Sequence, residues 1–229
     1  MRHLEPYHSQ QWVGRVLIMT AVEAERDAVL RGLRGAKEVD VMLAGVGAAS
    51  AAAHTARALT ASGPYGLVVS AGIGGGFAGR AEVGSIVIAD AIVAADLGAE
   101  TGEGFSSLDE LGFGTTRMPV AASLADRLQA ALSAAGLPAC SGPVLTVATV
   151  TGTAETAREL SVRVPGAAAE AMEGYGVAAA AAMFGLPALE IRTISNAVGP
   201  RDRSAWRIPD ALAALEAASS TLREVLQQL

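Results

Sequence analysis

The stretch Tyr65–Phe77, YGLVVSAGIGGGF, places an uninterrupted apolar run directly before a cluster of glycines. A short continuous run of this kind is typical of a strand that is buried on both faces, as in a parallel sheet. The cluster consists of Gly72, Gly74, Gly75 and Gly76. Such glycines indicate either a tight turn or a place where backbone N–H groups approach a ligand closely. No Gly-Lys-Ser/Thr follows, which excludes a Walker A phosphate loop here.

Apolar runs of the same kind recur along the chain and alternate with segments of helical spacing. The predicted strands lie at residues 15–21, 39–45, 65–72, 84–96, 142–152 and 186–195. The predicted helices lie at residues 23–33, 45–62, 121–136, 153–163, 174–185 and 208–229. This alternation predicts an α/β fold, with a mixed, mostly parallel central sheet flanked by helices. We expect a single domain over residues 15–229 after a flexible leader at residues 1–14.

Composition limits the classes of function. The 229 residues carry a net charge of −6 without a block of Lys or Arg, which argues against a nucleic-acid partner. The single cysteine, Cys140, excludes disulfides and cysteine-based metal sites within one chain. The longest small-apolar run, Val177–Leu189, is too short to span a bilayer, and the polar N-terminal stretch lacks the apolar core of a signal peptide. We therefore predict a cytoplasmic protein without a membrane partner.

One segment departs from the alternation. Leu97–Pro119 is rich in glycine and polar residues and is too long for a simple connector. Loops of this length in compact domains are usually functional or mobile, so we expect either a loop that serves the site or a solvated flap.

Acidic and amide side chains stand where predicted strands end, which is where ligands bind in such sheets. Glu23 and Glu25 follow the first strand, and either is a candidate general base. Both also suit the first turn of a helix, where acids interact favourably with the dipole. Ser195 and Asn196 end the last strand. These residues mark the sheet edge to search for chemistry.

Glu173 stands between Met172 and a glycine-rich, otherwise apolar helix. Burying a carboxylate without partners is costly, so Glu173 should face a polar ligand, for which a pair of sugar hydroxyls is a natural donor set. A helix N-cap is the alternative. The segment GPRDRSAWRI gathers Arg201, Arg203 and Arg207 around Trp206, which indicates either an anion or aromatic site or a rim of salt bridges.

Four segments, taken in order, resemble the purine nucleoside phosphorylase/nucleosidase superfamily. They are MTAVEAE, SAGIGGGFAGRAEVGSIVIAD, AMEGYGVA and IRTISNAVGPRD, and the resemblance extends from Val16 to the end of the chain. Within the superfamily the chain looks most like the branch that hydrolyses futalosine in the alternative menaquinone pathway. The methylthioadenosine/S-adenosylhomocysteine nucleosidases are near relatives of that branch.

The resemblance implies a role for each matching residue. Glu25 would activate the attacking water, Glu173 would hold the ribose hydroxyls with Met172 against the sugar, and Asn196, after Ser195, would face the purine N7 edge. Backbone groups at Ile73, Gly74 and Val150 to Thr153 would meet the nucleoside, and Arg201 the carboxylate of its aromatic 5′ extension. The resemblance implies no cofactor and no metal, and a homo-oligomer as the assembly.

Two departures favour hydrolysis over phosphorolysis. Related phosphorylases carry an Arg just before the glycine segment, where this chain has Ser70. Their first-strand loop faces phosphate, whereas here it carries Glu23 and Glu25, whose carboxylates would repel an anion. A phosphorylase for inosine-like substrates and an adenine-releasing nucleosidase remain the alternatives, and a non-catalytic nucleoside-binding protein is a third.

Asn196 also predicts which base leaves. Adenine-specific nucleosidases have an Asp here that donates a proton to N7, and an amide cannot transfer a proton. The amide N–H can instead bridge N7 and O6, so a 6-oxopurine such as hypoxanthine is expected. The aromatic residue that relatives stack on the base is missing from TGTAET, and Phe105, Phe113 and Tyr175 are candidates to replace it.

Overall fold

The computed structural model describes residues 14–228. Its strands are β1 Arg15–Thr20, β2 Val39–Leu43, β3 Tyr65–Gly76, β4 Ile86–Ala94, β5 Gly98–Thr101, β6 Gly104–Ser107, β7 Arg117–Met118, β8 Ala139–Thr146, β9 Ala169–Ala171 and β10 Ala188–Ala197. Its helices are α1 Glu23–Leu33, α2 Ala48–Ser62, α3 Leu108–Leu111, α4 Ala122–Ala134, α5 Ala154–Arg163, α6 Gly174–Met183 and α7 Ile208–Leu226, with a 3₁₀ turn at Arg203–Ala205. The leader predicted for residues 1–14 lies, apart from Gly14, outside the described residues.

The central sheet is mixed, and most of its pairings are parallel, as predicted. The pairs β1–β2, β1–β3, β3–β10, β4–β8 and β8–β9 are parallel, and β3–β9, β4–β7 and β4–β10 are antiparallel. Because β10 pairs with both β3 and β4, the strands β10, β4, β8, β9 and β3 close into a ring, so the sheet is barrel-like. The alternation of strands and helices in the sequence does not predict that the sheet closes into a ring.

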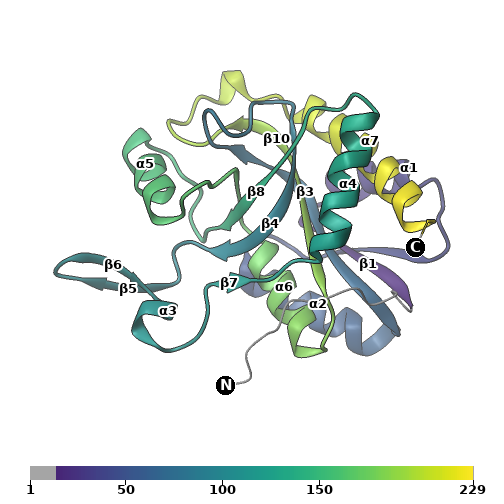
Figure 1. Cartoon of the computed structure of the whole chain (residues 1–229), viewed down its shortest axis with the longest axis horizontal. Helices are drawn as coiled ribbons and strands as arrows, with labels where there is room; N and C mark the ends of the chain where they lie inside the picture. The colour runs from purple at the N-terminus through teal and green to yellow at the C-terminus, as the bar shows by residue number, and fades with distance from the viewer. Residues whose placement is uncertain (1–13, 229) are drawn as a thin grey trace.

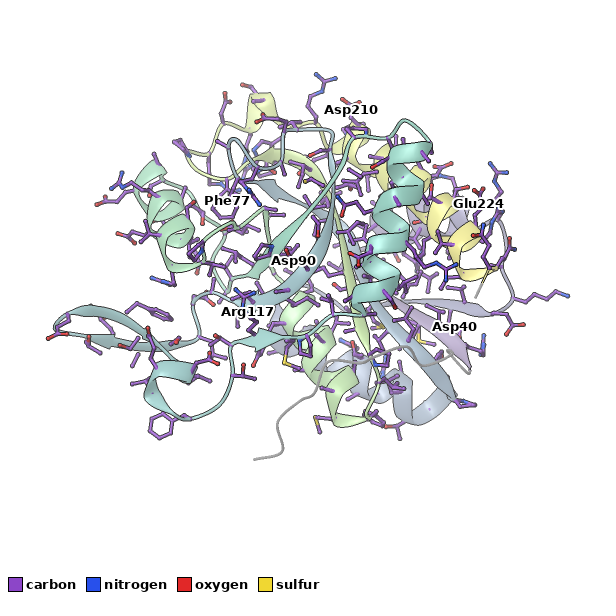
Figure 2. The ribbon with its side chains drawn as sticks, viewed as in Figure 1. Asp40, Phe77, Asp90, Arg117, Asp210 and Glu224 are labelled. Atoms are coloured by element: carbon purple, nitrogen blue, oxygen red, sulfur yellow. The ribbon has the colours of Figure 1, made fainter. Side chains whose placement is uncertain are left out.

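Helices cover the sheet on more than one side (Figure 1). The helices α1, α4 and α7 pack together over one apolar cluster, and α2 and α6 cover another. The contact between α2 and α6 is close because Gly176 has no side chain. A Cβ at Gly176 would lie 2.0 Å from the carbonyl oxygen of Ala48. A third cluster joins α5 to the sheet through Leu160 of the helix, Leu145 of β8 and Phe77, which Figure 2 labels. Small side chains thus let the elements approach closely.

Of the two interpretations of the glycine cluster, the tight turn is wrong, because β3 continues through the cluster to Gly76. A Cβ at Gly74 would lie 2.8 Å from the carbonyl oxygen of Glu170, and one at Gly76 would lie 2.1 Å from that of Ala81. The glycines therefore admit neighbouring backbone to an extended strand, which is a use of glycine that sequence alone does not separate from a turn.

The long segment at residues 97–119 is also more ordered than a loop. It forms the hairpin β5–β6, the short helix α3 and the strand β7. Ser107 caps α3 and exchanges hydrogen bonds with Glu110, which is a capping box. These elements are two to four residues long, too short to show a period in the sequence. Strand β9 was missed for the same reason.

No helix in the described range is long and apolar enough to cross a membrane.

Candidate active site

A cavity of about 290 Å³ lies over the carboxyl ends of β1, β3, β9 and β10. It brings together nine of the ten predicted site residues: Glu25, Ile73, Gly74, Val150, Met172, Glu173, Ser195, Asn196 and Arg201. The tenth, Thr153, does not line this cavity. Its hydroxyl accepts a hydrogen bond from the backbone N–H of Thr156 and caps α5, so Thr151 provides the wall at this point instead.

Glu25 is buried at one end of the cavity. Its Oε1 accepts a hydrogen bond from the backbone N–H of Ile73 at 2.9 Å. Its Oε2 accepts from the backbone N–H groups of Ala21 at 2.9 Å and Val22 at 3.3 Å. Burial raises the pKa of Glu25 above 4.5, although the nearby charge of Arg192 and these hydrogen bonds lower it. A fixed carboxyl with a raised pKa is suited to accept a proton from water.

The structure separates the two acids that follow the first strand. Glu23 is exposed at the start of α1 and lies 3.9 Å from Arg26, whereas Glu25 is 3% exposed and lines the cavity. Glu23 therefore fits the interpretation as an acid that interacts with the helix dipole, and Glu25 fits the interpretation as an active-site acid.

Glu173 lies at the N-cap of α6 but makes no side-chain capping bond to that helix. Its Oε1 accepts from the backbone N–H of Gly47 at 3.3 Å, and its Oε2 lies 3.3 Å from Nη1 of Arg192. Arg192 is 1% exposed; its Nε donates to Glu190 at 2.8 Å and its Nη2 to the hydroxyl of Ser70 at 2.9 Å. One guanidinium therefore joins carboxylates from β10 and the β9–α6 junction.

Gly72 makes room for this group of charges. It pairs with Arg192 across β3 and β10, and a Cβ there would lie 2.5 Å from Oε1 of Glu25 and 2.7 Å from Nη1 of Arg192. Glu25 and Arg192 thus meet over a strand position that has no side chain. We call the part of the cavity lined by Glu25 and Glu173 the acid end, and the buried Arg192 supports it from outside the lining.

Asn196 lies further along the cavity, where β10 is irregular. The register with β3 shifts between Ile194 and Asn196, so Ser195 is the extra residue of a bulge. Bulges re-aim side chains and are common beside active sites. The hydroxyl of Ser195 donates to Oδ1 of Asn196 at 2.8 Å, which leaves the Nδ2 group as the donor, and Nδ2 is bonded to the carbonyl of Ala197 at 3.0 Å.

Glu170 faces the same part of the cavity from β9 and was not predicted. Its Oε1 accepts from the backbone N–H of Thr151 at 2.8 Å, and its Oε2 accepts from the Thr151 hydroxyl. Asn196, Glu170 and Thr151 form what we call the amide end. A rise of about 3.3 Å per strand residue separates Gly72 at the acid end from Gly75 at the amide end by roughly 10 Å.

None of the aromatic residues proposed to stack on a base lies at this cavity. Phe105 lies under the guanidinium of Arg163 at 3.8 Å, Phe113 is 74% exposed, and the hydroxyl of Tyr175 donates to the carbonyl of Thr115. Among described residues the aromatic side chain that lines the cavity is Trp206.

Of the three arginines proposed for an anion, Arg201 lines the cavity. It lies 5.1 Å from the ring centre of Trp206, and Arg203 lies 5.9 Å from it. Arg207 pairs with Asp210 at the start of α7. The loop after β10 therefore supplies one cation and one aromatic ring to the rim.

Three charged residues in or beside the site were not predicted from the sequence. Glu190 and Arg192 are two apart in an apolar strand, so they share a face, and that alternation was a usable signal for a buried ion pair. Glu170 stands in the small-residue stretch before Met172 without any such pattern.

The segment at residues 97–119 lines a different, larger cavity of about 840 Å³ together with α5. Figure 1 shows the β5–β6 hairpin projecting at the lower left of the molecule, whereas β10 ends near the top. Within the described chain this segment does not line the cavity that holds Glu25. In residues 14–228 no group of three or more His, Cys, Asp or Glu side chains is placed to hold a metal ion.

A mixed α/β sheet with a carboxylate-lined cavity over its strand ends defines a protein that binds a small molecule at that edge. The chain belongs to the phosphorylase superfamily, whose family model matches residues 17–229. Futalosine hydrolase from Streptomyces coelicolor is 55% identical over 233 residues, which cover 93% of this chain and 96% of that protein. Futalosine hydrolase from Acidothermus cellulolyticus is 49% identical and covers 90% and 89% of the two chains.

The fold has close matches among solved structures. A 5′-methylthioadenosine/S-adenosylhomocysteine nucleosidase from Helicobacter pylori superimposes with a TM-score of 0.81 over 96% of this chain and all of that one, at 16% identity. At that identity the match supports the architecture alone.

Proposed function

We propose that this protein hydrolyses the N-glycosidic bond of futalosine, releasing hypoxanthine and dehypoxanthine futalosine for the alternative menaquinone pathway. The observation that carries the proposal is the buried carboxylate of Glu25, held by three backbone N–H groups at the acid end of the cavity. The 55% and 49% identical relatives that bear the name futalosine hydrolase support the choice of substrate.

The reaction breaks the bond between C1′ and N9 and adds one water across it. Glu25 positions the water and takes its proton as the oxygen bonds to C1′, and the departing purine ends with a proton on nitrogen. Glu173 accepts hydrogen bonds from the ribose hydroxyls, and its negative charge favours the oxocarbenium-like sugar of the transition state. Met172 lies at the same wall and packs against the sugar.

Arg192 keeps the acid end in place. It lies within 3.3 Å of Glu173 and donates to Glu190 and Ser70, so one face of the Glu173 carboxylate is fixed by the protein. The backbone N–H groups of Gly47 and Met172 also donate to this carboxylate, which leaves accepting capacity on Oε1 for the substrate. Because Arg192 is 1% exposed and engaged by carboxylates, its charge serves the acids and not an incoming anion.

A phosphorylase is the rival that shares the fold. Among described residues the cavity is lined by Glu25, Glu170 and Glu173 against one cation, Arg201. Carboxylates on the cavity wall would repel a bound phosphate, and this repulsion is stronger away from bulk water. The lining therefore disfavours phosphate and suits neutral water. Ser70, where phosphorylases carry an arginine, accepts a hydrogen bond from Arg192.

At the other end, the Nδ2 donor of Asn196 suits the N7 and O6 acceptors of hypoxanthine, and Trp206 offers a ring to stack on a base. Arg201 is the candidate partner for the carboxylate of the 5′ extension.

The test is to incubate the protein with futalosine, inosine and methylthioadenosine, with and without phosphate, and to measure free base. We expect hypoxanthine from futalosine at a rate that phosphate does not raise. Adenine release from methylthioadenosine at a higher rate would identify an adenine nucleosidase instead, and a phosphate requirement would identify a phosphorylase.

We also propose a cytoplasmic homo-oligomer. Apolar side chains are exposed at Phe113 (74%), Val162 (75%) and Met183 (82%), and contact with a second copy of the chain would cover apolar groups of this kind. Light scattering after size-exclusion chromatography gives the mass in solution, and a mass of 23.1 kDa would refute the oligomer.

A further inference from the structure

Glu170 is a buried carboxylate that the proposed reaction does not use. It is 5% exposed and lines the cavity from β9, where its neighbours in the chain are Ala169 and Ala171. Both of its oxygens accept hydrogen bonds from Thr151, one from the backbone N–H and one from the hydroxyl. A buried charge on a cavity wall needs a reason, because burial without compensation is costly.

The register of the sheet places Glu170 opposite Asn196. Gly75 of β3 pairs with Asn196 of β10 on one side and with Glu170 of β9 on the other. Residues in register on adjacent strands point to the same face, and two strand spacings put their Cα atoms about 10 Å apart. Gly75 between them carries no side chain, and Val198 and Asn196 take up the space over it, because a Cβ there would lie 2.9 Å from Cγ2 of Val198 and 3.3 Å from Nδ2 of Asn196. Asn196, Glu170 and Val198 line the same cavity, so a flat ring held there can present one edge to Asn196 and another to Glu170.

The contact between Glu170 and Thr151 changes the polarity of that wall. An uncovered backbone N–H at Thr151 would present a donor to the cavity, but here the donor is taken by Glu170. Each carboxylate oxygen accepts two hydrogen bonds, so Glu170 keeps accepting capacity after it binds Thr151. The wall therefore offers acceptors where the bare backbone would offer a donor.

The two forms of purine differ at this point. A 6-oxopurine carries a hydrogen on N1 and donates, whereas a 6-aminopurine has a lone pair on N1 and accepts. We propose that Glu170 is a specificity-determining residue that accepts the N1–H of a 6-oxopurine, while Asn196 donates to the N7 and O6 edge. This inference rests on the proposed function, because it assumes that the base of a nucleoside lies at the amide end.

The electrostatic surroundings of Glu170 favour an additional hydrogen-bond donor to its carboxylate. Burial raises the pKa of Glu170, the hydrogen bonds from Thr151 lower it, and the charge of Asp96 raises it further. A donor supplied by the ligand stabilises the ionised form, so binding of the correct base and the charge on Glu170 support each other.

The test is to measure the binding of free hypoxanthine and free adenine by calorimetry, which does not depend on hydrolysis. We expect the ratio of hypoxanthine to adenine affinity to fall at least tenfold in Glu170→Gln, because a hydrogen bond to a charged acceptor is lost. The matched control is Glu155→Gln, an exposed acid in the first turn of α5 that lines neither cavity. The control should keep the wild-type ratio.

A second measurement needs no variant, so it stands if Glu170→Gln fails to fold. The wild-type protein should bind 1-methylhypoxanthine, which has no N1–H, at least tenfold more weakly than hypoxanthine. Equal binding of these two bases, an unchanged ratio in Glu170→Gln, or no binding of either purine to the wild type would overturn the inference. Preferential binding of hypoxanthine without any cleavage of futalosine would refute the proposed function and leave the role of Glu170 standing.

Discussion

The two ends of the cavity lie beside the same strand, β3, but their central side chains differ in how firmly they are held. At the acid end Glu25 is 3% exposed, Glu173 is 6% exposed, and both lie around the buried guanidinium of Arg192. At the amide end Asn196 is half-buried, and its partner Ser195 belongs to a bulge. A charge-stabilising site must be rigid, whereas a group that selects a base needs the right donor in the right place.

The separation follows from glycine. Gly72 admits two charged side chains over β3, and Gly75, which pairs with both Asn196 and Glu170, admits Val198 and the amide of Asn196. Under the proposed function, the water chemistry and the base recognition would lie beside one strand, roughly 10 Å apart. The comparison predicts that changes at the acid end reduce the rate for every substrate, and that changes at the amide end alter which substrate is preferred.

The substitution Glu25→Gln is the strongest test of the predicted difference between the two ends of the cavity. We expect kcat to fall by about 10² to 10⁴, because the amide cannot take the proton of water. The matched control is Glu23→Gln, two residues earlier and exposed, which should keep the wild-type rate. Steady-state rates of base release measure both, and equal rates for the two variants would remove Glu25 from the chemistry.

Gly72→Ala should produce the next largest effect. The added Cβ would lie within 2.7 Å of both Glu25 and Arg192, so the charged group must shift, and we expect a loss of at least tenfold in kcat. Gly102→Ala, where a Cβ meets nothing within 4 Å, is the control and should be as active as the wild type. A fully active Gly72→Ala would mean that the close approach at Gly72 is not needed for turnover.

Asn196→Asp should sharpen the comparison at the amide end. A carboxylate faces O6 with like polarity, so we expect 6-oxopurine release to fall and the ratio of 6-amino to 6-oxo turnover to rise about tenfold. Turnover of inosine and adenosine, measured side by side, gives the ratio. If the ratio stays constant, Asn196 does not read the base.

The smallest expected effect is a shift in the acidic limb of the pH–rate profile to a higher pH than an ordinary glutamate would give. Glu25 must be ionised to accept a proton, and burial raises its pKa above 4.5. The rate should therefore be complete above that raised pKa and fall as pH decreases through it. A profile of kcat/KM against pH on a non-titrating substrate shows the limb, and a midpoint at or below 4.5 would exclude Glu25 as the titrating group.

Much of this arrangement could be predicted from the sequence, because apolar runs such as Leu17–Met19 and Val68–Val69 have few alternatives to a buried strand. Glu25, Glu173 and Asn196 were found because each stands at an element end. The rest could not be found, for physical reasons. The short strand β9 has no period, the glycines of β3 serve close approach instead of a turn, and Arg192 gains its role only when the ring of strands brings Gly72 beside it.

Trp206 illustrates the same limit of prediction from the sequence. The sequence placed it in a cluster of arginines, but only the fold shows that it lines the cavity while Phe105, Phe113 and Tyr175 do not. Contacts between segments distant in sequence decide which aromatic residue meets a ligand.

The central claim is that the acid end directs water, and not phosphate, to C1′. It is tested most directly by cleaving futalosine in ¹⁸O-labelled water with phosphate present and analysing the sugar product by mass spectrometry. The account predicts a free sugar that carries one ¹⁸O at C1′ and no sugar phosphate. A sugar 1-phosphate, or a product without the label, would contradict it.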